Sequence, residues 1–369
     1  MISWGHKMTD TQKLSARLQR AWHGRISGCM LGKAVELFSM REGASALQQY
    51  LRQVDALPLR NYIPYDAEHA SELIDQRCCA GHLLRSCPDD DINYSTLALL
   101  MLEKFGNALT TADVARSWMK YLPVASTFTA ERAAYRTLLN NAHEWFPEGR
   151  DPGFDLLECA DNEFNDWIGA QIRADVYGWV CPGKPDLAAQ LVTEDAQLSH
   201  RNEGIHGAVL VAVWGALIPV CETLEQALDQ ALAYIPNESD CAMAVAFAKQ
   251  LKGQANGGDA IRQHYPELSV VHTVNNLALV VWALLSHPDD FSAAIGDVVA
   301  AGLDTDCNGA TVGALWGLQD KEIPSFWSDP WQGLVGLSLA GTDTVNVDEL
   351  IDRSVTVAVA MSETKETSL

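Results

Sequence analysis

The sequence is poor in basic residues. Of its 369 residues, 26 are Lys or Arg and 48 are Asp or Glu, which gives a formal net charge of -22 at pH 7. A protein of this charge repels the phosphates of nucleic acids and the anionic surfaces of membranes. We therefore expect no nucleic acid and no membrane among its partners, whereas a phosphate-bearing small molecule remains compatible if divalent cations lie between.

Paired cysteine motifs and long apolar runs are also missing. The nine cysteines are scattered and form no Cys-x-x-Cys motif, which favours reduced thiols in a cytoplasmic protein over a disulfide framework or a zinc site. No run reaches the roughly 18–20 apolar residues of a membrane helix. The nearest candidate, 207–221, is broken by Pro219, and we expect it to form a buried helix. Residues 1–10 lack the apolar core of a signal peptide.

What the sequence has in abundance is helical periodicity. Apolar residues recur at helical spacing in many segments, without a fixed repeat period, and this predicts an all-α fold in a single large compact domain of ten or more helices. We place that domain at 13–355, between polar tails at 1–12 and 356–369. The expected helices are 14–34, 95–105, 112–119, 131–145, 187–190, 207–218, 224–234, 240–251, 270–285, 293–301 and 310–317.

Three glycines lie four residues apart on the first expected helix. Gly24, Gly28 and Gly32 share one face of that helix, where missing side chains let a second helix approach closely. Tight helix packing by itself explains this spacing, so the glycines alone do not indicate a functional site.

Two acidic segments each precede an apolar helical run. Asp89, Asp90 and Asp91 are adjacent, and one Asp suffices to cap a helix, whereas three repel one another unless a cation neutralises them. Asp304 and Asp306 flank Thr305 inside hydrophobic sequence, where carboxylates are unfavourable unless paired or bound to metal. A site made from both segments would hold several carboxylates at helix N-termini and would suit one or two Mg²⁺ ions.

Polar patches at 199–207, 162–175 and 272–276 interrupt apolar surroundings. Each is compatible with an internal hydrogen-bond network, but several patches in one domain also favour a polar cleft. The side chains that we name as candidate substrate contacts are His200, Glu203, His206, Asn275 and Asn276.

The order of these motifs resembles the ADP-ribosylglycohydrolase family, typified by the dinitrogenase-reductase-activating glycohydrolases, from near residue 20 to near 345. The family's Gly-x-x-x-Gly-x-x-x-Gly-Asp-Ala helix corresponds to Gly24 through Ala34. Its Thr-Asp-Asp motif corresponds to Asp89–Asp91. Its Gly-Asp-Thr-Asp-Thr motif, which precedes a helix of small residues, corresponds to 303–307.

The resemblance implies an all-α fold, a binuclear magnesium centre and hydrolysis of a glycosidic bond at ribose C1. The metal ligands that it implies are Asp89, Asp90, Asp91, Asp304 and Asp306. We name Glu36, Asp90 and Asp304 as catalytic candidates, with Glu36 as the base because it lies at the end of the glycine helix. An exposed helix-end glutamate is the alternative interpretation of Glu36. The expected substrate is an ADP-ribosylated protein, another ADP-ribosyl conjugate or a small N-ribosyl compound.

Three positions depart from the family pattern and predict a divergent subgroup. Lys33 replaces the Asp of the first motif, Asp89 replaces a Thr, and Cys307 replaces a hydroxyl ligand. Mn²⁺ or a single ion therefore remains compatible, as does an oligomeric protein. Two other functions also stay open: a non-catalytic protein that binds ADP-ribose or nucleotide, and a metal-dependent phosphohydrolase.

Overall fold

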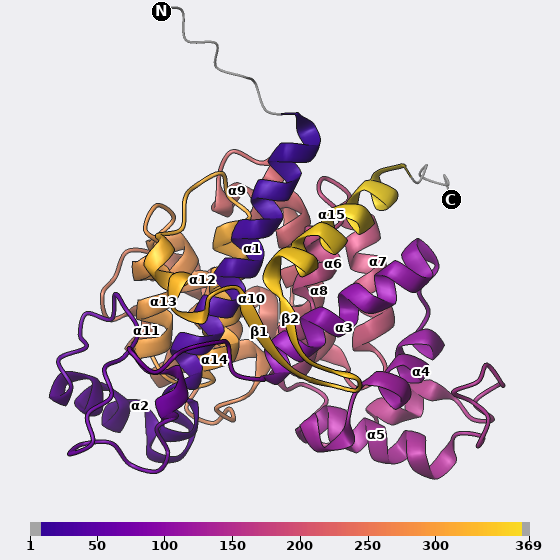
Figure 1. Cartoon of the computed structure of the whole chain (residues 1–369), viewed down its shortest axis with the longest axis horizontal. Helices are drawn as coiled ribbons and strands as arrows, with labels where there is room; N and C mark the ends of the chain where they lie inside the picture. Colours follow the sequence, from indigo (N-terminus) through magenta and orange to yellow (C-terminus); the bar gives the residue numbers. More distant parts are fainter. Residues whose placement is uncertain (1–8, 364–369) are drawn as a thin grey trace, which may run out of the picture.

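The computed structural model describes residues 9–363, and two antiparallel helices form its centre, α1 (Asp10–Lys33) and α14 (Thr305–Gly317). Figure 1 shows α1 running through the middle of the molecule, with α11–α13 on one side and α3–α5 on the other. Gly28 lies against the backbone of Gly309 so closely that a Cβ would collide with it, and Gly24 meets Gly313 in the same way. The predicted tight packing of the glycine face is confirmed, and it brings the end of α1 to the start of α14.

The remaining elements of the described chain are almost all helical, which confirms the all-α, single-domain prediction. Within residues 9–363 there are fifteen α-helices, several short 3-10 helices and one antiparallel strand pair. Besides α1 and α14, the elements are α2 (Glu36–Gln53), α3 (Asp90–Phe105), α4 (Thr111–Tyr121), α5 (Thr129–Asn141), α6 (Asp175–Trp179), α7 (Pro185–Ala196), α8 (Asn202–Leu217), α9 (Leu224–Ala231), α10 (Asp240–Gln250), α11 (Gly257–His264), α12 (Thr273–Ser286), α13 (Phe291–Ala300), β1 (Leu334–Leu339), β2 (Thr342–Asn346) and α15 (Val347–Glu363).

The core consists of helices that are apolar on nearly every face. Almost all residues of α8, α12 and α14 are buried, as expected for helices surrounded by other helices. The segment Asn202–Val220, which contains α8, is the one candidate among the described residues with the length and composition to cross a membrane. Its most apolar window is 72% buried inside the molecule, so core packing accounts for its composition.

The strand pair was not predicted, and it supports the segment that leads into α3. β1 and β2 form an antiparallel hairpin. The backbone of Ser86 donates to the carbonyl of Leu334 and accepts from Gly336, and Ser338 donates to the side chain of Asn93 on α3. The hairpin thereby holds the chain on both sides of Asp89, Asp90 and Asp91.

Both predicted tails are shorter in the structure. Helix α1 begins at Asp10 behind a capping box formed by Thr9 and Gln12, inside the predicted 1–12 tail. Helix α15 continues to Glu363, so the prediction of a polar tail from 356 is wrong for 356–363. Val357, Ala358 and Met361 are spaced for one helical face and are buried against the core, which extends the helix. Residues 1–8 and 364–369 lie outside the described residues.

Candidate metal centre

Carboxylates from three helix starts meet at one place. Asp89 caps α3, Asp304 precedes α14, and Glu36 opens α2. Carboxylate oxygens of Asp89, Asp90, Asp91 and Asp306 all lie within 4.8 Å of one another, and those of Glu36, Asp304 and Asp306 form a second such group. Asp306 belongs to both groups, so the two acidic segments that are distant in sequence form a single site.

A tight turn presents Asp304 to this site. Gly302 and Leu303 both have left-handed backbone conformations, with φ of 83° and 61°. The Ser39 hydroxyl donates to the Leu303 carbonyl at 2.8 Å, and the Asn276 side-chain oxygen accepts from the Asp304 amide at 3.2 Å. These bonds hold Asp304 against the packed ends of α1 and α14.

The acidic site carries more negative charge than its protein neighbours balance. Oδ1 of Asp304, Oδ1 of Asp306 and Oδ2 of Asp91 are buried and have no hydrogen-bond partner among the described residues. Burial, followed by the nearby carboxylate of Asp89, raises the pKa of Asp306 to about 6. Burial is also the largest cause that raises the pKa of Asp304 well above its usual range. Unpartnered, buried carboxylate oxygens fit the ligand preference of a hard divalent cation.

Two basic side chains already contact the carboxylates. Nζ of Lys33 lies 2.7 Å from Oδ2 of Asp89 and 3.8 Å from Oε2 of Glu36. The carboxylate of Asp89 raises the pKa of Lys33 far above its usual range, so Lys33 stays charged. Arg25 is fully buried on the inner face of α1, where it binds Oδ1 of Asp91 at 3.1 Å and also pairs with Asp175.

Arg25 and Asp175 were not predicted as site residues. A charged side chain directly beside the glycine face of α1 was the available signal, because a helix face that packs so closely can accommodate a charge only if a partner awaits it.

Glu36 is the acid of this site that faces a solvent-accessible hollow. Its side chain is 22% exposed and, with Lys33 and Arg77, lines a hollow of about 350 Å³. Burial, together with the charge of Asp306, raises the pKa of Glu36 well above its usual range. A carboxylate with a raised pKa beside an open hollow is suited to accept a proton from water.

Comparison with known proteins agrees with the fold. A family model described as ADP-ribosylglycohydrolase matches residues 10–362. This chain belongs to the ADP-ribosylglycohydrolase family. A solved structure entitled "ADP-ribosylglycohydrolase-related protein complex" is 17% identical, with a TM-score of 0.56 over 95% of this chain and 99% of that chain. At this identity the likeness supports the fold alone, and no curated protein sequence matches the chain.

Two thiols lie beside the carboxylates of this ADP-ribosylglycohydrolase family member, and one of them, Cys307, departs from the motif pattern. The sulfur of Cys307 lies within 4.8 Å of oxygens of Asp91 and Asp306, and that of Cys29 lies equally close to Asp89 and Asp91. Burial raises the pKa of both thiols, so they stay protonated and are poor ligands for a hard cation.

Of the candidate substrate contacts, Asn276 is joined to the acidic site. Its side-chain oxygen accepts from both the Asp304 amide and the Asn308 side chain, the latter at 2.7 Å. Its amide nitrogen donates to the carbonyls of Val270 and His272, so Asn276 ties α12 to the Asp304 turn. Asn275, in the first turn of α12, donates to the Ser269 carbonyl in the segment before that helix. Contact of either side chain with substrate stays a prediction.

His200, Glu203 and His206 have their contacts elsewhere in this family member. Glu203 accepts from the Cys241 amide at the start of α10, and His206 lies 3.3 Å from Glu203. His200 is fully buried, bonds Ser199 at 2.8 Å, and has its pKa lowered by burial, so it is uncharged. A substrate role for these three side chains stays a prediction.

The polar patch that contains His200 is an internal network centred on Arg173. This buried guanidinium binds Glu131 at 2.6 Å, Asp195 at 2.5 Å and Ser199 at 2.7 Å. Tyr177 donates to Asp195 at 2.5 Å. The network joins α5, α6 and α7, and it accounts for Arg173 of the 162–175 patch and for Ser199 and His200 of the 199–207 patch.

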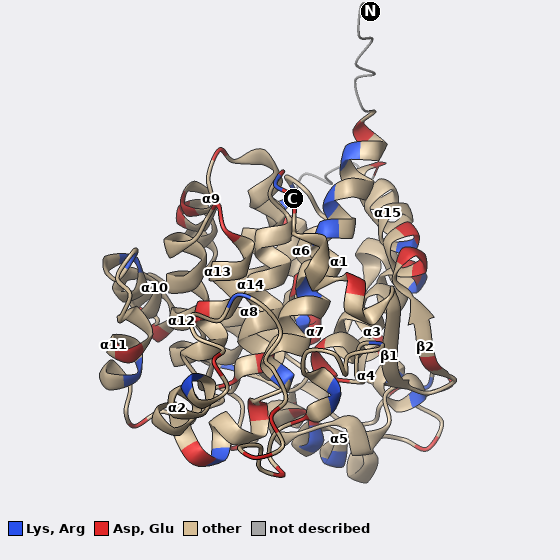
Figure 2. Cartoon of the chain, turned by 60° about the vertical axis from the view of Figure 1, so that its left-hand side comes forward, with Lys and Arg blue, Asp and Glu red and all other residues tan. Residues whose placement is uncertain are grey.

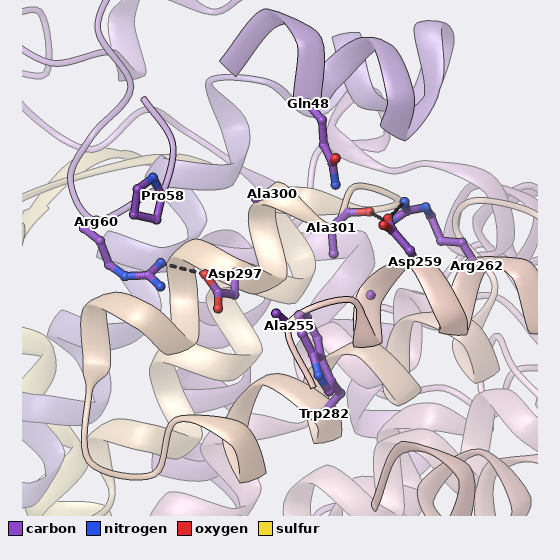
Figure 3. A pocket seen from close by; sticks show the side chains of 11 residues that line it. Gln48, Pro58, Arg60, Ala255, Asp259, Arg262, Trp282, Asp297, Ala300 and Ala301 are labelled. Atoms are coloured by element: carbon purple, nitrogen blue, oxygen red, sulfur yellow. Dashed lines mark hydrogen bonds and ion pairs between the residues drawn. The ribbon is translucent and has the colours of Figure 1, made fainter. Parts of the chain in front are cut away.

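A second hollow, of about 290 Å³, lies between α2, α11 and α13. Figure 3 shows its charged groups in pairs, with Arg60 beside Asp297 and Arg262 beside Asp259. Arg60 is 2.6 Å from Asp297. Both guanidinium groups of this hollow therefore already have carboxylate partners.

Proposed function

We propose that this chain is a divalent-cation-dependent hydrolase that cleaves the glycosidic bond at ribose C1 of an ADP-ribosyl conjugate or a small N-ribosyl compound. Family membership supports this class of reaction. The observation that carries it is the group formed by Glu36, Asp304 and Asp306, in which buried, unpartnered carboxylate oxygens lie next to an acid that faces a hollow.

Each side chain has a distinct task in the proposed reaction. Asp304 and Asp306 would hold the cation with Glu36 beside them, and a bound divalent cation supplies charge that fixes the ribose hydroxyls. The bond between C1 and the leaving group breaks with oxocarbenium character, and the bonding electron pair departs with the leaving group. A water oxygen bonds to C1 while Glu36 takes the water's proton. The carboxylate of Asp90 stabilises the positive charge that develops on the ribose.

We propose Mg²⁺ as the cation, with Mn²⁺ as the alternative, because the unpartnered ligand atoms are carboxylate oxygens and the nearby thiols are protonated.

We also propose a reducing, cytoplasmic location, which is supported by nine free cysteines, eight of them buried. The net charge of -22 supports a small or protein-bound substrate over nucleic acid. Figure 2 shows charged positions of both signs spread over elements throughout the molecule.

The test is turnover of ADP-ribosyl-arginine and of a simple N-riboside by the full-length protein, with Mg²⁺, with Mn²⁺ and with EDTA. We expect EDTA to abolish release of the free sugar. We also expect Glu36→Gln to lower kcat by about 100-fold or more, as for loss of a general base. Glu322→Gln, at an exposed position, is the matched control and leaves kcat unchanged. Turnover that is insensitive to EDTA would refute the metal mechanism, and release of phosphate would identify a phosphohydrolase.

A non-catalytic ADP-ribose-binding protein is a second candidate, favoured by the ion pair between Lys33 and Asp89 and by the thiol of Cys307. It predicts measurable ADP-ribose binding by calorimetry with no product after prolonged incubation with either substrate.

A further inference from the structure

We infer that the ammonium group of Lys33 occupies a cation position of the acidic site, so that this chain binds one divalent cation, held by Asp304 and Asp306 beside Glu36. The inference rests on the proposed function in that it assumes a cation-binding site. It goes further by assigning the number of ions and by giving Lys33 the place of a second one.

The first observation is that both carboxylate oxygens of Asp89 are already bound by groups of the chain itself. Its Oδ2 is 2.7 Å from Nζ of Lys33, and its Oδ1 accepts from the Asp91 amide at 2.9 Å. A charge-assisted bond of this length is among the stronger hydrogen bonds in proteins. Asp89 is therefore both neutralised and held in place by groups of the chain itself.

The second observation concerns the other acids in the same group. Asp91 gives Oδ1 to the buried guanidinium of Arg25. The group formed by Asp89, Asp90, Asp91 and Asp306 is thus already in contact with two fixed positive charges. Because Asp89 and Asp91 are paired with these charges, less negative charge remains among these acids to attract a divalent cation, and the two positive charges repel it.

The third observation is that Asp304 and Asp306 keep two unpartnered oxygens between them, whereas Asp91 keeps one, Oδ2, and Asp89 keeps none. Oδ1 of Asp304 and Oδ1 of Asp306 are buried without a hydrogen-bond partner among the described residues. Glu36 is 3.8 Å from Lys33, farther than a hydrogen bond. Asp304 and Asp306 therefore have the free ligand atoms that attract a divalent cation, and the single ion pair of Glu36 with Lys33 leaves most of the negative charge of the three acids uncompensated.

The position of Lys33 is set by the packing of α1. Gly32 lies against the backbone of Thr305, and the Thr305 hydroxyl donates to the Gly32 carbonyl at 2.8 Å. Lys33 follows directly and is only 17% exposed, so its side chain is held among the carboxylates. A lysine at this point of a fixed helix end acts as a built-in monovalent cation.

Metal stoichiometry tests the inference without relying on activity. The full-length protein is stripped with EDTA, and Mn²⁺ binding is measured by calorimetry and by the electron paramagnetic resonance signal of free Mn²⁺. We expect one ion per chain in the wild type. Lys33→Met removes the charge and keeps the stem, and we expect it to bind two ions. The double variant Lys33→Met with Asp89→Asn is expected to return to one ion, because the freed carboxylate is gone.

Lys252→Met is the matched control. Lys252 pairs with Glu225 at 2.6 Å on another part of the surface, so its loss is expected to leave the stoichiometry at one. Circular dichroism establishes that each variant is folded. If Lys33→Met does not fold, single substitutions in the acids decide the question: Asp304→Asn is expected to abolish Mn²⁺ binding, and Asp89→Asn is expected to retain one ion.

Two ions in the wild type, one ion in folded Lys33→Met, or loss of binding in Asp89→Asn would each overturn the inference. These results leave the proposed hydrolysis intact. Conversely, the number of Mn²⁺ ions bound could rise from one in the wild type to two in Lys33→Met while the wild type hydrolyses no ribosyl substrate. That result would support the inference and reject the proposed function. Zero ions in the wild type would overturn both the inference and the metal mechanism.

Discussion

Asp306 is the residue on which the two carboxylate groups depend, because it is the member they share. It is buried, its Oδ1 has no hydrogen-bond partner among the described residues, and its pKa is raised to about 6. A buried charge of this kind lowers the stability of the fold unless a cation is present. Residues held in this state are typical of functional sites, where stability is sacrificed for activity.

We predict that Asp306→Asn raises the stability of the metal-free protein and lowers its metal binding and turnover. Removal of the buried charge is expected to raise the melting temperature of the metal-free protein. Loss of a ligand is expected to weaken Mn²⁺ binding and to lower turnover, each by about 100-fold or more. Thermal unfolding, calorimetry and the hydrolase assay measure these three effects.

Asp289→Asn is the matched control for Asp306→Asn. Asp289 is 83% exposed and pairs with Lys321, so its substitution is expected to change none of the three quantities appreciably. A metal-free Asp306→Asn protein that is less stable than the wild type would contradict the view that the carboxylate is destabilising.

At the scale of elements, the contact between α1 and α14 builds the site. Gly28 and Gly309 bring the two backbones together, and the antiparallel arrangement places Glu36 and Asp306 at the same end of the pair. The glycines that let α1 and α14 pack closely thereby also set the distance between the acidic side chains.

We predict that Gly28→Ala lowers both stability and activity. Its Cβ would collide with the carbonyl of Gly309, so the helices must move apart. Overpacking of this kind typically costs about 1–3 kcal/mol of unfolding free energy. The shift also separates Asp306 from Glu36, and turnover is expected to fall more than the loss of folded protein explains. Urea unfolding and kcat at a temperature well below the transition check this.

Gly215→Ala in α8 provides the comparison for Gly28→Ala. A Cβ there would meet only ordinary van der Waals neighbours, the nearest being Leu318 at 3.4 Å. Because Ala is a better helix former than Gly, this variant is expected to be as stable as the wild type or slightly more stable. Equal losses in both variants would argue against a specific role for the α1–α14 contact.

For the molecule as a whole, the buried acids predict an unusual pH dependence. Asp306 has a pKa of about 6 in the folded protein, against 3.8 for an ordinary Asp, and burial is the main cause. The folded state therefore binds more protons than the unfolded state in this range. The resulting contribution to stability is fully present below pH 3.8 and is lost as the pH rises through about 6. Asp90, Asp91 and Asp304 shift in the same direction.

We predict that the metal-free protein melts at a lower temperature at pH 7 than at pH 5, by about 2 °C or more. Added Mg²⁺ is expected to narrow the difference, because a cation bound to the ionised acids stabilises the folded state at neutral pH. Calorimetric scans at both pH values, with EDTA and with Mg²⁺, measure this. A melting temperature that rises from pH 5 to pH 7 in EDTA would refute the prediction.

Much of the helical architecture could be predicted from local patterns, and the exceptions have identifiable causes. Helix α2 was not predicted, and it contains Gly43 with a φ of 82°, so its helical pattern is interrupted. Helix α15 was not predicted because it contains many β-branched residues, which obscure its helical spacing. The β1–β2 hairpin was not predicted because its two strands pair with each other across a turn, and helical spacing does not indicate such pairing. The expected helix 131–145 ends earlier, at Asn141.

The sequence by itself determined the helical class, the glycine face of α1 and the two acidic segments at helix starts, because each of these is a regularity of neighbouring residues. Only the tertiary structure decided which charges meet. The pairing of Lys33 with Asp89, the burial of Arg25 beside Asp91 and the enclosure of His200 in the Arg173 network join residues that are distant along the chain. Such pairings follow from how whole helices pack, and no local spacing encodes them.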